Sequence, residues 1–524
     1  MRLAKPAVLA ALLSGIWVLP AVAQDLTIGR SSEQSSLDPQ FSRTGNNQMT
    51  SIMLFDRLVE FDPNLQVSPG LAESWEVVDP TTWTVHLRPG VKFHDGSAFT
   101  ADDVIYSLER ADEVPNSPAP YTDMVSAVAS MEKIDDLTLK ITTNEPAPTL
   151  MQDIGRVFII SKAASEGKAS ADFNDPATAV GTGPYVLEAW KPGETLSVKA
   201  NADYWHKVPE FKDVEIRYIS NDAARVAALL SGAVDVIDAV PPQDVARVDA
   251  TDGLHSYSVT SGRVIYLGLS MRGDQAPGVT DLAGKPLDVN PFKDVRVRKA
   301  VSLMIDRDLI VDRILGGSGV PAGQLAGEAL GGHNPDVKPD QPDVAKAKEL
   351  LAEAGYPEGF GITVYSSNDR FPGDGDLAQA LGQMLARGGL KVNGVEALPY
   401  SVYSKAASAG DYGAFVFSLG ASTPNSAPLL QALLHTYDKE RGLGEFNRVR
   451  FSDPAYDAAL EETMQEFDPA VLESELKDLT AMVFAEQPIV PLYWQKVHWG
   501  LKDGLTIRAG LSEETLPQDV SSEN

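Results

Sequence analysis

LAESWEVVDPTTWTVHLRPGVKFHDGSAFTADDVIYSLER, residues 71–110, is the stretch that decides the fold of this chain. Apolar residues alternate with polar ones over Trp83–Leu87, which is the period of a half-buried strand. Pro89 and Gly90 then turn the chain, and a second apolar alternation at residues 91–93 predicts another short strand. The stretch is therefore expected to begin as strand, turn and strand.

A helix is expected after these two strands. Thr100 and Asp103 can satisfy free backbone N–H groups at its start, and Val104, Ile105 and Leu108 give it one apolar face. The second half of the stretch is therefore predicted to be a capped amphipathic helix.

Several motifs in this region resemble a known family. LAESWE, LRPGVKFHDG and FTADDV, in this order, are similar to the fingerprint of the family 5 extracellular solute-binding proteins, the dipeptide, oligopeptide and nickel receptors of ABC importers. GTGPY at 181–185, NADYW at 201–205 and VRKAVSLMIDRDLI at 297–310 extend the resemblance. It implies an α/β, two-lobed periplasmic-binding-protein fold of type II, large peptide-receptor class, with a discontinuous first lobe and an extra subdomain.

The order of elements along the chain agrees with two lobes. Strands alternate with helices, and apolar strands at Val264–Met271 and Pro488–Trp494 are interpreted as two crossings between α/β lobes. We expect a signal peptide at 1–23, lobe I at 24–268 with a subdomain within about 60–180, lobe II at 269–489, and a return to lobe I with the C-terminal tail at 490–524.

Two further expectations concern local structure. A long helix is predicted from Val295 through Leu315, with its arginines on a solvated face. The polar C-terminal tail, Ser512–Asn524, is predicted to be loose.

The N-terminus has the features of a secretory signal. Arg2 and Lys5 are basic, residues 7–19 are apolar, and Ala21–Ala23 is an A-x-A cleavage site. The chain has no cysteine, which excludes disulfides, cysteine nucleophiles and a lipidated N-terminal cysteine. We therefore expect a periplasmic protein, released from a cleaved signal peptide and not lipid-anchored.

Composition and motifs also exclude several functions. A formal net charge of −29 speaks against nucleic acid and anionic membranes as partners. No G-x-S-x-G occurs, and the S-x-x-K match at 165–168 lacks K-T-G and S-D-N. Gly278–Pro286 misses the P-loop spacing by one residue, and the 7 histidines show no metal-binding spacing. The sequence therefore predicts no enzyme, no metal and no cofactor.

Candidate ligand contacts come from the resemblance. In dipeptide-binding relatives the loop after the first strand faces the ligand, and here it contains Ser42, Arg43 and Thr44. A second segment carries an arginine that pairs with the ligand carboxylate, and Arg370 with neighbouring Phe371 is its best match.

A third segment departs from the family pattern. Relatives place there an aspartate that pairs with the peptide's amino group, whereas this chain has Gly420 followed by Ala421. A buried ammonium without a carboxylate would cost roughly several kcal/mol. Asp369, Asp374 and Asp376 are alternative partners that the sequence does not place.

The resemblance implies the periplasmic substrate-binding component of an ABC transporter. It would bind peptides or a related small polar solute as a monomer, close about a hinge, and deliver the solute to the permease and ATPase complex of the inner membrane. A receptor for a non-peptide solute, such as a sugar or an opine, is the alternative, and a secreted hydrolase is a weaker one. The identity of the ligand stays open.

Overall fold

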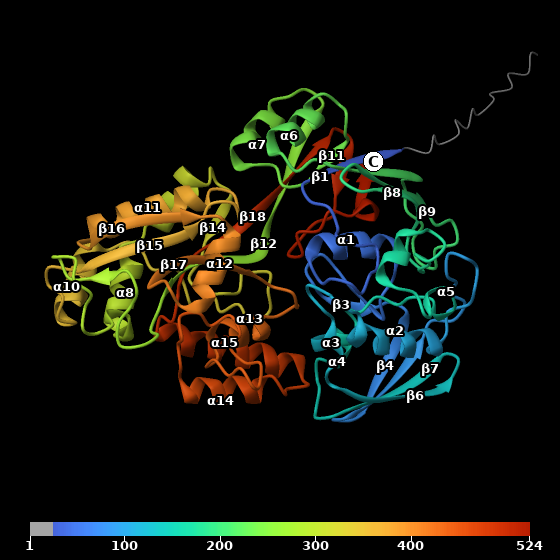
Figure 1. Cartoon of the computed structure of the whole chain (residues 1–524), viewed down its shortest axis with the longest axis horizontal. Helices are drawn as coiled ribbons and strands as arrows, with labels where there is room; N and C mark the ends of the chain where they lie inside the picture. Colours follow the sequence, from blue (N-terminus) through green and yellow to red (C-terminus); the bar gives the residue numbers. More distant parts are fainter. Residues whose placement is uncertain (1–24, 524) are drawn as a thin grey trace, which may run out of the picture.

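The computed structural model describes residues 25–523, so the predicted signal peptide lies outside the described residues. Two lobes lie side by side and are joined by two long strands (Figure 1). These are β12 (Leu254–Leu269) and β18 (Val490–Lys502), which pair antiparallel. Within residues 25–523 we find no helix with the length and apolarity to cross a bilayer.

One 12-stranded sheet runs through both lobes because β12 and β18 contribute to each of them. Lobe I adds to it β11 (Val236–Ile237), β1 (Leu26–Arg30), β10 (Asp213–Tyr218), β9 (Thr195–Ala200) and β8 (Tyr185–Lys191). Lobe II adds β17 (Ala414–Gly420), β15 (Gly361–Ser367), β13 (Val279–Thr280), β16 (Lys391–Leu398) and β14 (Gly319–Pro321). The pairing of β12 with β18 shifts register between Thr260 and Val264, so the chain passes between lobes inside these strands. The predicted lobe limits at 268 and 489 stay a prediction.

The opening stretch forms a separate subdomain of lobe I. A four-stranded antiparallel sheet has the order β4 (Ala72–Asp79), β5 (Thr82–Leu87), β7 (Thr138–Thr143), β6 (Val128–Asp135). Trp83, Val85 and Leu87 are buried, as the alternation predicted. The prediction of a second short strand at residues 91–93 is wrong. Only an isolated bridge joins Lys92 to Ala98, because a turn reverses the chain before a ladder can form.

Helix α2 (Ala101–Glu113) packs in this subdomain and confirms the predicted cap. Asp103 accepts hydrogen bonds from the backbone N–H and the hydroxyl of Thr100, both at 3.0 Å. The other carboxylate oxygen of Asp103 accepts from Lys162 N at 3.0 Å. One side chain therefore closes the helix start and fixes the following segment.

Two of the family-like motifs meet at a buried carboxylate. Asp56 accepts from Thr182 Oγ1 at 2.8 Å, Trp205 Nε1 at 2.7 Å and Tyr204 Oη at 3.1 Å. Burial raises the pKa of Asp56, and these three hydrogen bonds act in the opposite direction. GTGPY and NADYW are thus tied together at the end of helix α1 (Gly45–Leu54).

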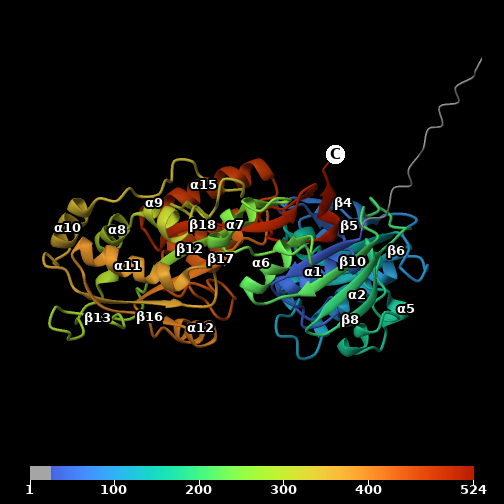
Figure 2. The same ribbon diagram turned by 90° about the horizontal axis from the view of Figure 1, so that it is seen from above.

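The remaining elements complete the two lobes. Lobe I also contains β2 (Val59–Phe61), β3 (Val67–Pro69), α3 (Thr122–Val125), α4 (Leu150–Ile154), α5 (Lys162–Ser165), α6 (Asp222–Leu230), α7 (Pro242–Asp249), β19 (Leu505–Ile507), β20 (Val520–Ser522), and the 3-10 turns at Ser170–Asn174 and Pro517–Asp519. Lobe II contains a 3-10 turn at Pro291–Lys293 and α8 (Val295–Leu303), α9 (Arg307–Leu309), α10 (Val344–Glu353), α11 (Asp374–Gly388), α12 (Tyr400–Ala409), α13 (Ala427–Leu434), α14 (Pro454–Thr463) and α15 (Pro469–Ala485). Seen from above, helices lie on both faces of the lobe II sheet (Figure 2).

The predicted long helix from Val295 is wrong. Helix α8 ends at Leu303. Asp306 then caps a new helical segment by accepting a hydrogen bond from Leu309 N. This segment continues as one π-helical stretch at Ile310–Ile314. Its arginines do not all face solvent either. Arg298 and Arg307 are each 3% exposed, and they donate to the backbone carbonyls of Gln487 and Pro491. Each arginine thus satisfies a carbonyl of a segment distant in the sequence.

The predicted loose tail is also wrong. Thr515, Leu516 and Val520 are buried, and β20 pairs with β19. Arg30 donates to Thr515 O at 2.8 Å, and Trp499 Nε1 donates to Thr515 Oγ1 at 2.7 Å. The tail is held because its few apolar residues and its backbone fill the core of lobe I.

Candidate ligand-binding site

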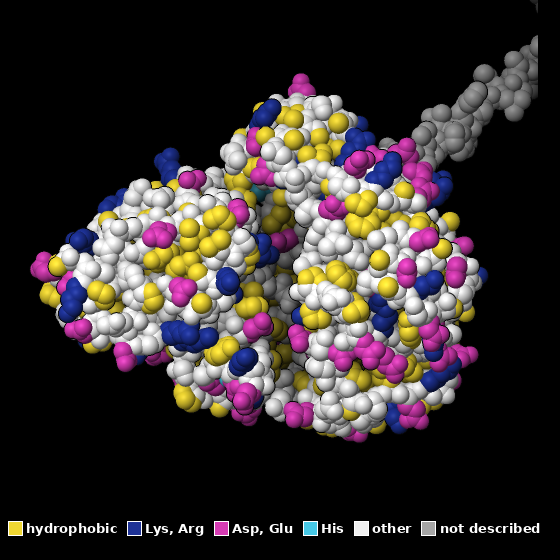
Figure 3. Space-filling model, in the orientation of Figure 1, with side chains coloured by type: hydrophobic (Ala, Val, Ile, Leu, Met, Phe, Trp, Pro, Cys, Tyr) yellow, Lys and Arg dark blue, Asp and Glu magenta, His cyan; other side chains and the backbone are white. Residues whose placement is uncertain are grey.

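The carboxyl ends of the central strands of the two lobes face each other. In lobe I, β1 and β11 run parallel, and β11 runs antiparallel to β18 toward lobe II. In lobe II, β15 and β17 run parallel, and β17 runs antiparallel to β12 toward lobe I. The loops after these strands therefore meet at the boundary, where α/β sheets commonly bind ligands. A groove separates the lobes on the surface (Figure 3).

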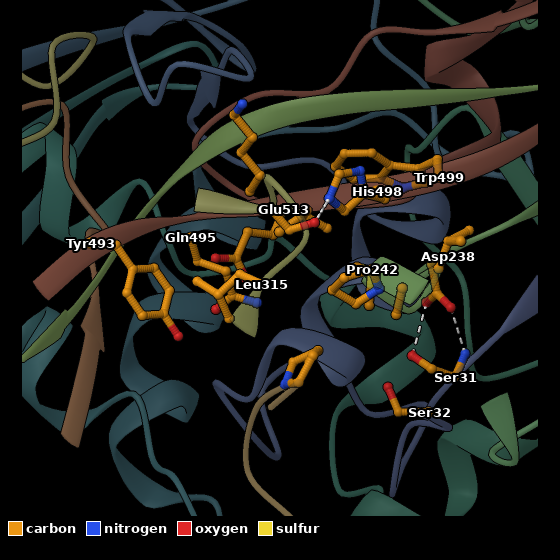
Figure 4. Close-up of a pocket in the computed structure, with 17 residues that line it drawn as sticks. Ser31, Ser32, Asp238, Pro242, Leu315, Tyr493, Gln495, His498, Trp499 and Glu513 are labelled. Atoms are coloured by element: carbon orange, nitrogen blue, oxygen red, sulfur yellow. Dashed lines mark hydrogen bonds between the residues drawn. The ribbon is translucent and has the colours of Figure 1, made fainter. Parts of the chain in front are cut away.

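A pocket of about 220 Å³ is lined by residues of both lobes, and Figure 4 shows its lining side chains. Both lobes and the joining strand contribute to its wall, which makes it an interface pocket of the kind that usually holds small molecules. The lining includes Ser31, Ser32, Met49, Asp238 and Glu513 from lobe I, Leu315, Ser318 and Pro372 from lobe II, and Tyr493 and Gln495 to Trp499 along β18.

A larger hollow of about 470 Å³ lies elsewhere in lobe I. Its wall comes from the end of α1, the loop that contains Tyr204 and the C-terminal segment around Asp519. Lobe II contributes nothing to it, so closure of the lobes would not change its contacts. We therefore take the smaller pocket as the candidate site.

Asp238 shapes the lobe I side of the pocket. Its carboxylate accepts from Ser31 N at 2.8 Å and from Ser31 Oγ at 3.1 Å, and both bonds are drawn in Figure 4. Burial raises the pKa of Asp238, while Arg225 and Arg30 nearby counteract that shift. Arg225 lies 3.5 Å away. Asp238 is thus an internally paired residue that orients the loop after β1.

The joining strand carries polar groups with spare capacity. His498 Nδ1 and Gln495 Oε1 are buried and have no hydrogen-bond partner among the described residues. His498 Nε2 lies 2.7 Å from Ser318 Oγ, and burial lowers the pKa of His498. Both side chains line the pocket, so a polar solute can satisfy them.

The first predicted contact segment lies away from this pocket. Ser42 is buried, and its hydroxyl lies 3.0 Å from the hydroxyl of Thr44. The Arg43 guanidinium donates to the Asp123 carboxylate at 3.1 Å, and Arg43 N donates to Ala119 O in the subdomain. None of the three lines the pocket. Their role in ligand binding stays a prediction.

The second predicted segment reaches the groove. Arg370 is exposed, its guanidinium lies 5.1 Å from the centre of the Tyr400 ring, and no carboxylate within 4.0 Å pairs with it among the described residues. Phe371 is half-buried against the lobe II core, and Pro372 lines the pocket. Arg370 itself does not line the pocket, so its role in ligand binding stays a prediction.

The neighbouring aspartates are engaged. Asp374 is buried and accepts from Ser367 Oγ at 2.7 Å and from Arg370 N at 3.0 Å. Asp369 accepts from Tyr400 N at 2.7 Å. Both therefore hold the loop itself, which leaves them poorly suited to replace the carboxylate absent at position 421.

The third predicted segment lies where lobe II meets the crossing strand. Gly420 pairs with Arg263 of β12, and Ala421 N donates to Gly262 O at 2.9 Å. Arg263 donates to Glu513, which belongs to the pocket wall. Sequence reasoning missed Arg263 and Glu513: one precedes an apolar strand and the other lies in the segment expected to be loose.

No metal site accompanies these residues. Within residues 25–523 no three His, Asp or Glu side chains gather in a way that could hold a metal ion. The chemistry available at the pocket is hydrogen bonding, ion pairing and apolar contact.

Comparison with known proteins agrees with this geometry. The family model of the bacterial extracellular solute-binding proteins, family 5 Middle, matches residues 66–441. The chain belongs to this family. This match confirms the predicted family and the type II periplasmic-binding-protein fold. It also confirms the predicted function as the solute-binding component of an importer.

Individual family 5 relatives cover most of the chain. Heme-binding protein A of Haemophilus influenzae is 28% identical over 472 residues, 84% of this chain and 82% of that protein. Glutathione-binding protein GsiB of Pectobacterium atrosepticum is 28% identical over 493 residues, 92% of this chain and 90% of that protein. The structure of HbpA2 from Haemophilus parasuis superposes with a TM-score of 0.82 at 24% identity, covering 96% of this chain and 100% of that one. Heme-binding protein A and GsiB are named as binding proteins, not enzymes.

Proposed function

We propose that this protein is the periplasmic receptor of an ABC importer, processed from a precursor by removal of residues 1–23 and acting as a monomer. It presents its solute to a permease and ATPase complex in the inner membrane. The observation that carries the proposal is the pocket between the lobes, because its wall comes from both of them and from the strand that joins them. Closure would add contacts from the second lobe, so the solute shifts the population toward the closed form.

The solute we propose is peptide-like and carries a carboxylate. Arg370 supports this, since its side chain is exposed in the loop that carries the pocket residue Pro372, and no ion pair to it is found among residues 25–523. The family 5 relative named for glutathione supports a small peptide as the ligand class. Ala421 favours a second candidate, a non-peptide solute such as an opine or a sugar, because no carboxylate at that position selects for a free amine.

Mass spectrometry of solute carried through purification would identify the ligand class. Small-angle scattering with and without that solute would test the hinge, and we expect a smaller radius of gyration in its presence. Identical scattering curves across a panel of peptides, opines and sugars would contradict the hinge mechanism. Turnover of any of these compounds would instead support the hydrolase alternative.

A further inference from the structure

Three arginines gather in lobe II outside the pocket between the lobes. Arg272 follows β12, and Arg448 and Arg450 lie in the segment between α13 and α14. Met271 N donates to Val449 O at 2.7 Å, so the two segments that carry the arginines lie side by side. None of the three lines the pocket. They therefore form a cluster separate from the candidate solute site.

The cluster lies at the end of the lobe II sheet that is away from the groove. Arg272 Nη1 donates to Ala409 O at 2.5 Å, and Arg448 Nε donates to Ser408 Oγ at 3.3 Å, so both are held at the C-terminal end of α12. The chain then enters β17, which runs for 7 residues toward the groove. A strand of that length spans roughly 20 Å.

The arginine cluster has no counter-charge. Among residues 25–523 none of the three arginines forms an ion pair. Acidic side chains of the same segments do not neutralise them: Asp274 pairs with Lys293 at 3.1 Å, Asp453 caps α14, and Asp411 and Glu445 form no ion pair. The chain has 73 acidic residues against 44 basic ones, so a shortage of carboxylates does not explain three unpaired arginines.

Aromatic rings fix the planes of two of these guanidinium groups. The Arg450 guanidinium lies 3.8 Å from the centre of the Tyr437 ring, and that of Arg448 lies 4.2 Å from the centre of the Phe417 ring. A guanidinium that lies over a ring keeps its N–H groups at its edge, where they can bind an oxyanion through paired hydrogen bonds. The two groups are therefore held in orientations that suit anion binding.

Most N–H groups of the cluster are not used by the protein. Arg450 Nη1 donates to Asn447 O at 2.7 Å, and Arg448 lies near the buried hydroxyl of Tyr266, whose pKa burial raises and Arg448 lowers. A guanidinium carries several N–H donors in one plane. One or two contacts for each arginine leave the remaining donors of the cluster for a ligand.

Arg450 occupies a costly position. Its φ is +59°, a conformation that non-glycine residues rarely adopt and that persists where the surrounding structure imposes it. Burial, and then the charges of Arg272 and Arg448, lower the pKa of Arg450, whereas Tyr437 raises it. A glycine would adopt this φ at lower cost and without repulsion, so the charged side chain itself is what the position gains.

We propose that Arg272, Arg448 and Arg450 form a second binding site, one for a multiply charged tetrahedral oxyanion. Phosphate and sulfate have this chemistry, either as free ions or as the phosphoryl or sulfuryl group of a larger molecule. Arginine forks match the oxygens of such groups through paired hydrogen bonds. A single carboxylate carries one charge and would leave two of the three arginines without a counter-charge. The site goes beyond the proposed function, since it does not involve the groove.

Calorimetry at constant ionic strength tests the site with four probes: inorganic phosphate, sulfate, acetate and glycerol 3-phosphate. We expect phosphate and sulfate to bind saturably and at least about tenfold more tightly than acetate. Glycerol 3-phosphate that binds as tightly as phosphate would identify a phosphoryl group of a larger molecule as the ligand, and much weaker binding would identify the free ion. Absence of phosphate and sulfate binding, or equal affinity for acetate, would overturn the proposal.

Variants assign the binding to the cluster. Arg450→Gln and Arg272→Gln should each weaken phosphate binding at least about tenfold, since each removes one fork. Arg217→Gln removes the same charge from an exposed pair on β10 and should leave phosphate binding unchanged. Phosphate affinity that stays the same in Arg450→Gln and Arg272→Gln would overturn the assignment.

Urea unfolding separates anion binding from a structural role. Phosphate should raise the urea midpoint of the wild type above its value in chloride at the same ionic strength, because a ligand that binds only the folded state stabilises it. The midpoint of Arg450→Gln should respond much less. An equal response of the wild type and this variant would show that Arg450 does not act through an anion.

The outcome is independent of the receptor function. A protein that binds phosphate through these arginines but never closes around a solute keeps the anion site and loses the proposed receptor function. A protein that closes around a solute but does not bind phosphate or sulfate remains a receptor, and the anion site is then wrong.

Discussion

Ser318 Oγ lies 2.7 Å from His498 Nε2. This contact links Ser318 of lobe II to strand β18 at the point where β18 enters lobe I. Lys496 N also donates to Ser318 O at 3.2 Å. The two bonds tie the segment beside β14 to β18. A titratable side chain therefore lies on the strand that joins the lobes, in the wall of the pocket.

Removing the imidazole of His498 should flatten the pH dependence of stability. Burial and, next, Lys496 lower the pKa of His498, while Asp249 raises it. Below about pH 6.5 the unfolded chain takes up a proton that the folded chain does not, so the free energy of unfolding falls as pH falls. His498→Asn keeps a polar group for Ser318 but does not titrate.

Urea unfolding from pH 7.5 down to 5 measures this effect. The wild type should lose more stability over the range than the variant does. Two parallel curves would contradict the assignment of a lowered pKa to His498.

Replacing Arg370 should weaken the binding of a carboxylate solute. If closure buries the charge pair, Arg370→Ala should cost about 2–5 kcal/mol of binding free energy, because the ligand carboxylate is left without a partner. Calorimetry with the solute recovered from purification measures the change, and Arg217→Ala on the surface of β10 is the control. Unchanged affinity would remove Arg370 from the site.

Substitution of Gly183 should destabilise lobe I. A Cβ added there would lie 2.5 Å from the carbonyl carbon of Leu54 and 2.7 Å from Phe55 N, so the backbone of one segment must move. We expect Gly183→Ala to reduce the free energy of unfolding by about 1–3 kcal/mol or more. Gly45→Ala is the matched control, since a Cβ at Gly45 meets nothing within 4 Å. Equal urea midpoints for the two variants would contradict this packing.

Replacing Arg298 should cost far more stability than replacing its neighbour Arg296. Arg298 donates to the carbonyls of Phe292 and Gln487 at 2.8 and 3.0 Å. Arg298→Met would leave such buried acceptors without a donor and should cost about 3 kcal/mol or more. Arg296→Met removes an exposed pair with Asp294 and should change the unfolding curve little. A similar loss in both variants would refute the distinction.

Local signals in the sequence predicted much of the fold. The alternation at Trp83–Leu87 and the box formed by Thr100 and Asp103 both appear in the structure, because each depends on residues a few positions apart. The long helix from Val295 failed for a reason outside its own sequence pattern. Arg298 and Arg307 fit the helical pattern, but distant carbonyls at Gln487 and Pro491 determine where they lie.

The candidate site was less predictable. Arg370 was chosen by resemblance to a family motif, and its place in the site stays a prediction, although Pro372 of the same loop lines the pocket. Glu513 could not be found in this way, because its place at the pocket depends on a tail that folds back onto lobe I more than two hundred residues from its partner Arg263. The segment Ser42–Thr44 shows the converse, since it follows the first strand yet contacts the subdomain.

The sequence by itself determined the family, the strands and helices with local signals, and the existence of two crossings between lobes. Only the tertiary structure decided which charged side chains reach the pocket. The reason is that secondary structure follows short-range periodicity, whereas the pairing of Arg263 with Glu513, and the burial of Arg298, depend on segments that meet only after the sheet has closed through β12 and β18.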